Sequence, residues 1–302
     1  MKLVALLFAT TSLSATLQFS ELRIDYSGIP AIEKFSARDQ EQLDYRFYPS
    51  SSETLLILLH GSGWHSRYFF KMAKTLGEGG VAKVLTPDLR GHGEHPKKRG
   101  DVDYIGQFDD DLVDLIKFAR KKYSPRRIIL GGHSSGGGLA LRFAGSVHQD
   151  LVDGFVFLAP YLKHDAPTVK QDAGWAEAKI MRVIGLSLLN TLGIHMLDHV
   201  VTLTFNLPKK YRDGTETLEY THTTVVSFTP DDYEKDFKAL RKPTLLLVGG
   251  KDEAMVASAF SAVVPKAKSF QAQILLGISH MGVVVNPVAT QALSAWLEKQ
   301  SK

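Results

Sequence analysis

Short apolar runs of strand length alternate with segments whose apolar residues recur at helical spacing. The run Thr54–Leu59 is apolar almost throughout, which is typical of a central strand buried on both faces. Strands that alternate with helices predict an α/β fold with a mainly parallel sheet covered on both faces. The other expected strands are Leu43–Tyr48, Ala82–Thr86, Arg127–Leu130, Gly154–Ala159, Thr244–Val248 and Gln271–Leu276, and the expected helices are Phe108–Lys121, Leu139–Val147 and Ala289–Leu297.

One long segment, residues 163–238, breaks this alternation because it contains no convincing central strand. Its part Ile180–Val201 is rich in Leu, Ile, Met and Val at helical spacing, but it also carries charged residues and is no membrane span. We expect a helical lid, inserted before the strand Thr244–Val248, whose apolar face packs over the sheet edge or an acyl chain. This face consists of Ile180, Ile184, Leu188 and Leu192.

The N-terminus has the layout of a secretory signal peptide, with Lys2 before a short apolar run and small residues after it. Residues 1–15 are the expected signal, and residues 16–302 form a single domain with the lid as its insertion. This interpretation predicts a secreted or periplasmic protein. The alternatives are an N-terminal strand or an uncleaved segment that anchors the protein to a membrane.

The amino-acid composition excludes some classes of function. The 302 residues are 44% hydrophobic and 23% charged, which is ordinary for a globular protein. A formal net charge of +4, dispersed along the chain, gives no reason to expect a nucleic-acid partner. The chain has no cysteine, so thiol catalysis, disulfides and thiolate metal sites are excluded.

The segment around Ser134 carries a nucleophile motif. Gly132-His133-Ser134-Ser135-Gly136 has the pattern G-x-S-x-G, and it follows an expected strand and opens an expected helix. In this context the serine sits on a strained turn that exposes its hydroxyl, and the glycines avoid clashes with neighbouring backbone. Ser134 is therefore the candidate nucleophile, with Gly132 and Gly136 in support.

Other interpretations of this glycine-rich turn fit less well. A phosphate-binding P-loop would end in Gly-Lys-Ser/Thr, and a dinucleotide fingerprint would need G-x-G-x-x-G after the first strand. Neither motif is present in this turn. Ser135 is a competing serine, but it lies one position away from the centre of the motif.

A second glycine turn, around Ser62, follows the strand Thr54–Leu59 and leads into a helix. Acyl transfer requires two N–H donors aimed at the oxyanion. The backbone N–H groups of Ser62 and Ser135 are the expected donors, and Gly61 allows a close backbone approach. His60 is expected to brace this loop rather than to act in catalysis.

Chain order selects the base and the acid among many histidines and carboxylates. His280 follows the last expected strand and Asp252 follows the preceding one, so both belong to the sheet edge that carries Ser134. Catalysis by such a triad needs a neutral imidazole whose tautomer a carboxylate fixes. His280 is the expected base and Asp252 the expected acid, while Glu253 and Asp165 are the substitutes.

Two histidine clusters suggest metal sites. His195 and His199 are four residues apart beside Asp198, and Asp88–His95 contains two further histidines. The first lacks a clear third ligand and is interpreted as a polar lid face, and the second as a loop that braces the active-site edge. We therefore expect no metal and no cofactor.

Several of these motifs resemble a known family. His60–Tyr68 is similar to the HGxGxHSxRY segment of the monoacylglycerol lipase and lysophospholipase branch of the α/β-hydrolase superfamily, although nothing separates Ser66 from Arg67. Asp88–Gly93 resembles the D-x-R-G-H-G loop of that branch, and the Gly-x-x-Asp and Ser-His-Met-Gly turns complete the pattern. The resemblance implies an α/β-hydrolase fold with a mostly parallel, eight-stranded sheet.

The resemblance also implies a serine hydrolase that cleaves carboxylic esters through an acyl-enzyme. Its substrate would be a small-molecule ester, with the apolar lid favouring a lipid and a transient contact with a membrane surface. The same triad would also serve an acyltransferase, a thioesterase or a serine aminopeptidase. A non-catalytic binding protein on this fold is the alternative from another class.

Overall fold

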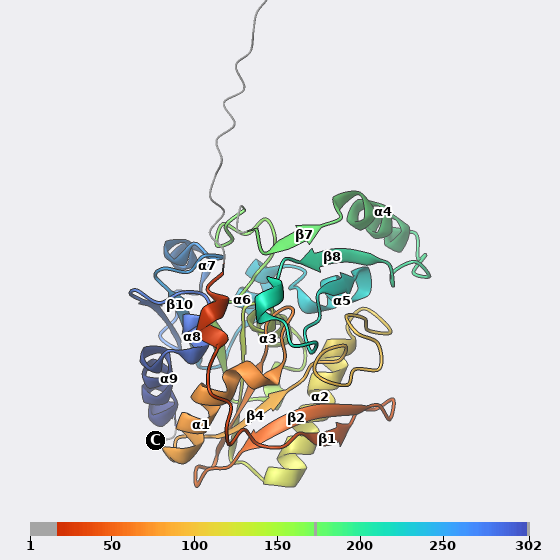
Figure 1. Ribbon diagram of the computed structural model, residues 1–302. Coiled ribbons are helices and arrows are strands. Elements are labelled where there is room, and N and C mark those ends of the chain that lie inside the picture. Colours follow the sequence, from red (N-terminus) through yellow and green to blue (C-terminus); the bar gives the residue numbers. More distant parts are fainter. Residues whose placement is uncertain (1–16, 172–173, 301–302) are drawn as a thin grey trace, which may run out of the picture.

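An eight-stranded sheet forms the centre of the computed structural model, which describes residues 17–171 and 174–300 (Figure 1). The strand order is β1-β2-β4-β3-β5-β6-β10-β11. Strand β2 runs antiparallel to both of its neighbours, and the other pairs are parallel. The strands are β1 Glu33–Ser36, β2 Gln42–Tyr48, β3 Thr54–Leu59, β4 Lys83–Pro87, β5 Arg127–His133, β6 Gly154–Leu158, β10 Thr244–Gly249 and β11 Phe270–Leu275.

Two groups of helices cover the sheet. Helices α1, α8 and α9 pack against one another on one side, while α2, α3, α5 and α6 form the second group (Figure 1). Every residue of β3, β6 and β10 is buried between them, as the unbroken apolar runs require. The helices are α1 Phe70–Glu78, α2 Gln107–Tyr123, α3 Ser135–Gly145, α5 His222–Phe228, α6 Tyr233–Ala239, α7 Phe260–Val263, α8 Gly282–Val285 and α9 Pro287–Gln300.

The expected mainly parallel, eight-stranded fold is confirmed. The seven strands expected from apolar runs are all present, and most of their ends agree within one residue. Strand β5 continues to His133, three residues past its expected end, because Gly131 and Gly132 pair with β6 instead of starting the turn. Strand β1 was not expected, since its four residues include two charged ones and it lies at the edge of the sheet.

The inserted segment differs from the expected helical lid. Between β6 and β10 it contains a small antiparallel sheet in the order β7-β8-β9, in addition to its helices. Strands β7 and β9 have three residues each and include a glutamate, so they give no strong strand signal, whereas the Val-Thr-Leu-Thr-Phe sequence of β8 does give one. The segment includes β7 Ala176–Ala178, α4 Ile180–Thr191, β8 Val201–Phe205 and β9 Glu219–Thr221.

Helix α4 packs on β8 at the outer margin of the molecule (Figure 1). Its buried residue is Leu186, with Val183 and Leu189 half-buried on the same side. The expectation that the opposite face packs over the sheet edge is wrong, because its residues are 57–69% exposed. Arg182 and Asn190 lie on the side of the helix that carries Leu186, so the spacing favoured the opposite, more apolar face, which the packing leaves exposed. The exposed face consists of Ile180, Ile184, Leu188 and Leu192.

The expected signal peptide, residues 1–15, lies outside the described residues. Within the described parts of the chain, no helix has the length and apolar character needed to cross a membrane. The helix expected to continue to Val201 ends at Thr191, so His195 and His199 lie in the connection to β8 rather than on a helix.

Candidate active site

Ser134 lies between the end of β5 and the start of α3. Its backbone has φ of 53° and ψ of −120°, a region that L-residues with a side chain rarely adopt. Such strain persists only where the surrounding structure enforces it, and it is typical of functional positions. The side chain is half-buried, whereas the residues before it in β5 are buried.

Two glycines allow this turn to pass close to other backbone. A Cβ atom on Gly132 would lie 2.2 Å from the carbonyl oxygen of Gly136, and one on Gly136 would lie 2.3 Å from that of Leu59. Both distances are far below van der Waals contact, so no other residue fits without moving backbone. Gly61 lies opposite the turn, where an added Cβ would be 3.1 Å from the Cβ of Ser134.

Asp252 and His280 meet at the same edge of the sheet, after β10 and β11. Asp252 Oδ2 lies 2.8 Å from His280 Nδ1, and both residues are 2% exposed. The other carboxylate oxygen accepts the backbone N–H groups of Ala254 at 2.8 Å and Met255 at 2.7 Å. With Nδ1–H donated to Asp252, the Nε2 atom of His280 is left as a proton acceptor.

The two substitute acids occupy other positions. Glu253 Oε2 accepts the backbone N–H of His280 at 2.9 Å, so this carboxylate holds the loop rather than the imidazole. Asp165 is exposed. Among the three carboxylates considered from the sequence, Asp252 is therefore the one that contacts the ring of His280.

His133 connects the serine turn to the histidine loop. Its ring lies 4.6 Å from that of His280, centroid to centroid, and its Nε2 donates to the backbone carbonyl of His280 at 3.1 Å. No hydrogen bond joins Ser134 Oγ to His280 within residues 17–171 and 174–300. Catalytic hydrogen bonds are often long before substrate binds, so their absence here leaves Ser134 and His280 candidates for the same site.

A chain of buried hydrogen bonds continues from His133 to the oxyanion loop. Tyr68 donates its hydroxyl proton to His133 Nδ1 at 3.0 Å and accepts the backbone N–H of Gly61 at 2.8 Å. Burial holds the pKa of His133 well below its ordinary value, which keeps this ring neutral. The loop after β3, the serine turn and the histidine loop are thus tied together by two side chains.

His60 joins the oxyanion loop to the loop after β4. Its Nε2 accepts the backbone N–H of Leu89 at 3.0 Å, and its Nδ1 donates to the carbonyl of Gly61 at 2.9 Å. Burial lowers the pKa of His60 to about 3, so the ring is neutral at physiological pH. Both ring nitrogens serve the backbone, which makes this residue a brace.

The hydroxyls of Ser62 and Ser135 meet between these loops. Their Oγ atoms are 2.5 Å apart, and both side chains are half-buried among buried neighbours. The backbone N–H groups of the same two residues are the oxyanion donors expected from the sequence. The structure therefore brings the two expected donor residues into direct contact.

Tyr220, on β9 of the insertion, was not expected from the sequence. Its buried hydroxyl accepts the backbone N–H of Gly63 at 2.9 Å and donates to His92 Nε2 at 2.6 Å, while His92 Nδ1 donates to the carbonyl of Arg90. Burial raises the pKa of Tyr220. The N–H of Thr217 also donates to the carbonyl of Gly63 at 3.1 Å. The insertion therefore binds both the backbone N–H and the backbone carbonyl of Gly63 in the oxyanion loop.

Replacing Tyr220 with phenylalanine is expected to lower the free energy of unfolding by about 2 kcal/mol, because Gly63 and His92 lose their buried partner. Urea unfolding measures this change. Tyr211→Phe is the matched control in the same insertion, because its hydroxyl forms no hydrogen bond within the described residues. Equal stabilities of the two variants would show that the Tyr220 hydroxyl does not hold the loop.

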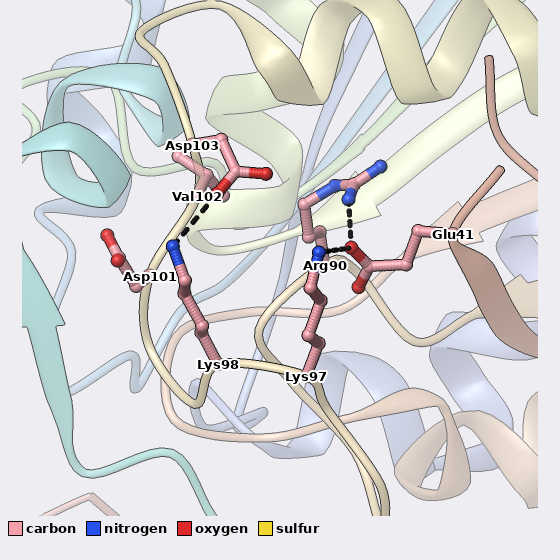
Figure 2. A pocket seen from close by; sticks show the side chains of 7 residues that line it. All are labelled: Glu41, Arg90, Lys97, Lys98, Asp101, Val102 and Asp103. Atoms are coloured by element: carbon pink, nitrogen blue, oxygen red, sulfur yellow. Dashed lines mark hydrogen bonds and ion pairs between the residues drawn. The ribbon is translucent and has the colours of Figure 1, made fainter. Parts of the chain in front are cut away.

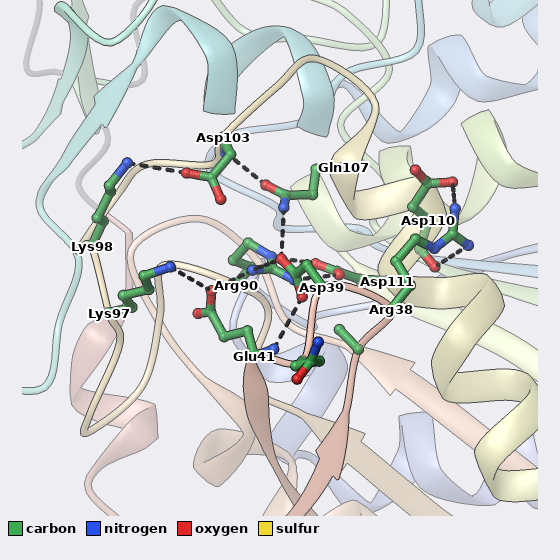
Figure 3. Close-up of polar contacts among 12 residues, drawn as sticks. Arg38, Asp39, Glu41, Arg90, Lys97, Lys98, Asp103, Gln107, Asp110 and Asp111 are labelled. Atoms are coloured by element: carbon green, nitrogen blue, oxygen red, sulfur yellow. Dashed lines mark hydrogen bonds and ion pairs between the residues drawn. The ribbon is translucent and has the colours of Figure 1, made fainter.

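The loop after β4 is braced by a polar network around Arg90 (Figure 3). Arg90 is 4% exposed and contacts both oxygens of Asp111 at 2.8 Å, and it also pairs with Asp39 and Glu41. This bidentate pairing fixes the start of the Asp88–His95 segment. Both ring nitrogens of His92 are engaged, by Arg90 and Tyr220, so this histidine serves the loop.

A small cavity lies beside this network (Figure 2). Its volume is about 10 Å³, the space of about one water molecule. The carboxylates of Asp39, Glu41 and Asp103 approach within 4.8 Å of one another there, but Arg90, Lys97 and Lys98 pair with them (Figure 3). The cluster is neutralised by the protein's own cations.

The two histidines considered as metal ligands in the insertion pair separately. His195 Nδ1 lies 3.0 Å from Asp198 Oδ2, whereas His199 Nδ1 lies 2.9 Å from Asp101 Oδ2. The two rings therefore pair with different carboxylates instead of converging on a shared ligand set.

A strained serine turn after the central strand β5, in a sheet with this strand order, defines the α/β-hydrolase class. Residues 50–284 match the family described as serine aminopeptidase, S33. This match spans more than half of the chain, so the protein belongs to that family, and the resemblance noted from the motifs is confirmed at this level.

Individual relatives match over shorter stretches. The chain is 32% identical to a putative methylesterase 14 of Arabidopsis thaliana over 93 residues, which are 30% of this chain and 26% of the relative. It is 29% identical to a monoacylglycerol lipase of Mycolicibacterium smegmatis over 89 residues, 30% of this chain and 31% of the relative. The chain thus spans about a quarter to a third of the length of these two relatives.

A solved structure supports the fold over nearly the whole chain. A soluble variant of the monoglyceride lipase of Saccharomyces cerevisiae, in complex with a substrate analog, has a TM-score of 0.71 and 18% sequence identity. The alignment covers 93% of this chain and 99% of that one. This similarity supports the arrangement of the sheet and helices.

Proposed function

We propose that this protein is a serine hydrolase that cleaves carboxylic esters, with Ser134 as nucleophile, His280 as base and Asp252 as the orienting acid. The observation that carries the proposal is the buried Asp252–His280 pair, at the same edge of the sheet as the strained turn of Ser134. Methylesterases and monoacylglycerol lipases among the relatives support an ester as the substrate.

The reaction follows from the proton positions. His280 Nε2 takes the proton of Ser134 as the hydroxyl oxygen attacks the ester carbonyl, and the carbonyl oxygen becomes an oxyanion. The N–H groups of Ser62 and Ser135 stabilise this charge. His280 then returns the proton to the leaving alkoxide, which departs as an alcohol and leaves an acyl-enzyme. Water, activated by His280, releases the acid and restores Ser134.

An apolar acyl group is the substrate feature that the insertion favours. The exposed face of α4, with Ile180, Ile184 and Leu188, covers no part of the described protein. Exposed apolar patches of this kind mark contact with another apolar surface. Arg182 is the exposed cation of α4 itself and can contact the headgroup of an anionic lipid. We propose that α4 contacts the membrane or micelle that presents the substrate.

Ile184→Glu and Leu188→Glu are expected to lower the hydrolysis rate of a long-chain monoacyl ester in anionic vesicles by about tenfold, because each removes several buried methylene groups from the lipid contact. Hydrolysis of soluble p-nitrophenyl acetate should not change. Ser187→Glu is the matched control, since Ser187 is also exposed on α4 but is polar. Equal vesicle rates for all three variants would contradict the contact.

The family description makes a serine aminopeptidase the second candidate. Such an enzyme needs acidic groups that hold a free amine. In the insertion, Glu177 already pairs with Lys179 at 2.8 Å, and Asp165 is exposed, which supports the ester more than the peptide. Acyltransferase and thioesterase activities would use the same acyl-enzyme.

The proposal is tested by a panel of p-nitrophenyl esters from acetate to palmitate, together with aminoacyl p-nitroanilides. Turnover of esters alone supports the proposal, and turnover of anilides alone supports the aminopeptidase. Labelling of Ser134 by a fluorophosphonate separates all catalytic alternatives from a non-catalytic binding protein. If a folded sample shows neither labelling nor turnover, the result supports the alternative that this is a non-catalytic binding protein.

A further inference from the structure

The two serine hydroxyls beside the proposed nucleophile have no role in the mechanism above. Ser62 comes from the loop after β3 and Ser135 from the first position of α3, directly after Ser134. Their Oγ atoms are 2.5 Å apart, and both side chains are half-buried while Gly61, Gly63 and Gly136 beside them are buried. The pair therefore lies at the accessible side of the loops that bear the proposed oxyanion donors.

The proton count of this pair leaves one donor free. A serine hydroxyl carries one proton and can accept two, and it rotates to suit its partners. The structure pairs each hydroxyl with the other, and that bond uses one of the two protons, while the hydroxyl of Tyr220 lies beside Ser62 as a further acceptor. When Ser62 donates to Ser135, the proton of Ser135 can turn toward a third oxygen. A hydroxyl that already accepts a short hydrogen bond is polarised and is a better donor.

We propose that the Ser62–Ser135 hydroxyl pair donates a third hydrogen bond to the oxyanion of the tetrahedral intermediate. An oxygen bound to both backbone N–H groups lies between the two residues, within reach of the side chains that branch beside those groups. The inference rests on the proposed function, because it needs Ser134 to form the intermediate. The mechanism above uses only the backbone N–H groups of Ser62 and Ser135. This inference adds a catalytic role for their side-chain hydroxyls.

The expected size of this contribution follows from other enzymes. Loss of one donor from an oxyanion hole lowers kcat by about 10²- to 10³-fold, because the donor acts only when charge develops in the transition state. The pair acts through one shared proton, so the effects of its two hydroxyls should not be independent. Either serine alone keeps one proton and can replace part of the lost interaction.

The experiment compares Ser62→Ala, Ser135→Ala and the double variant in the full chain. It measures kcat and KM for p-nitrophenyl butyrate, and Ki for an alkyl trifluoromethyl ketone. The ketone carbon bonds to Ser134 Oγ, the serine proton passes to His280, and the carbonyl oxygen becomes an oxyanion. Ser66→Ala is the matched control, because the Ser66 hydroxyl is buried and has no partner within the described residues.

The double variant is expected to lose about 10²-fold or more in kcat, with KM within about threefold, and its Ki should rise by the same factor as kcat/KM falls. Each single variant should lose only about threefold, because the remaining hydroxyl keeps one proton, so the product of the two single effects, about tenfold, falls short of the loss in the double variant. Ser66→Ala should stay within about twofold of the wild type. Should the double variant not fold, the single variants give the same comparison of Ki with kcat/KM.

Three results would overturn the inference. One is a double variant with unchanged kcat and Ki. Another is a fall in kcat with no matching rise in Ki, since the pair would then position the loops without contacting the oxyanion. A third is a loss of kcat in the double variant that equals the product of the losses in the two single variants, since the hydroxyls would then act independently. Activity that survives Ser134→Ala would instead overturn the proposed function, so the two failures are distinguishable.

Discussion

Ser134→Ala is expected to lower kcat for soluble esters by at least about 10³-fold and to abolish labelling by a fluorophosphonate, since the alanine side chain cannot attack the ester carbonyl. KM should change little, because the hydroxyl contributes mainly to the transition state. Steady-state kinetics and mass spectrometry of the labelled protein measure both effects. Retained labelling at another residue would show that the G-x-S-x-G motif does not hold the nucleophile.

Ser134→Gly gives a control on the folded state. Glycine adopts positive φ without strain, so this variant relieves the backbone conformation of Ser134, which has φ of 53°. It should be as inactive as the alanine variant and yet more stable than the wild type, by up to about 1 kcal/mol. A combination of lost activity and gained stability would separate the catalytic role of the hydroxyl from any structural role.

Asp252→Asn is expected to lower kcat by about 10⁴-fold while the structure stays intact. The backbone N–H groups of Ala254 and Met255 both bind Oδ1, so they hold the amide oxygen of the variant in that place. Its NH₂ group then faces His280 Nδ1 and donates to it. The other tautomer results, with the proton on Nε2, and the imidazole can no longer accept the proton of Ser134.

Glu253→Gln is the matched control for this prediction. Glu253 contacts the backbone N–H of His280 rather than its ring, and a glutamine oxygen can still accept that bond. The variant should keep kcat within about tenfold of the wild type. A larger loss in Glu253→Gln than in Asp252→Asn would reverse the assignment of the acid.

The sequence alone supported the layered architecture and the candidate residues. Runs of strand length predicted seven strands, and burial on both faces explains the unbroken apolar series in β3, β6 and β10, whereas β11 at the sheet edge is mostly exposed. The serine turn could be predicted because its glycines are needed for local reasons, and overlaps with backbone atoms at Gly132 and Gly136 explain why. Chain order placed Asp252 and His280 at a common sheet edge, and they lie 2.8 Å apart.

Only the tertiary structure decided how the loops are held together. Tyr220 contacts Gly63 and His92 from far along the chain, and nothing in the residues around Tyr220 distinguishes it from an ordinary core tyrosine. The exposed side of α4 could not be predicted, because its most apolar face is the one that the packing leaves exposed. Local geometry and periodic burial can be derived from the chain itself. Contacts between distant segments, such as the hydroxyl pair of Ser62 and Ser135, depend on the packing of the whole fold.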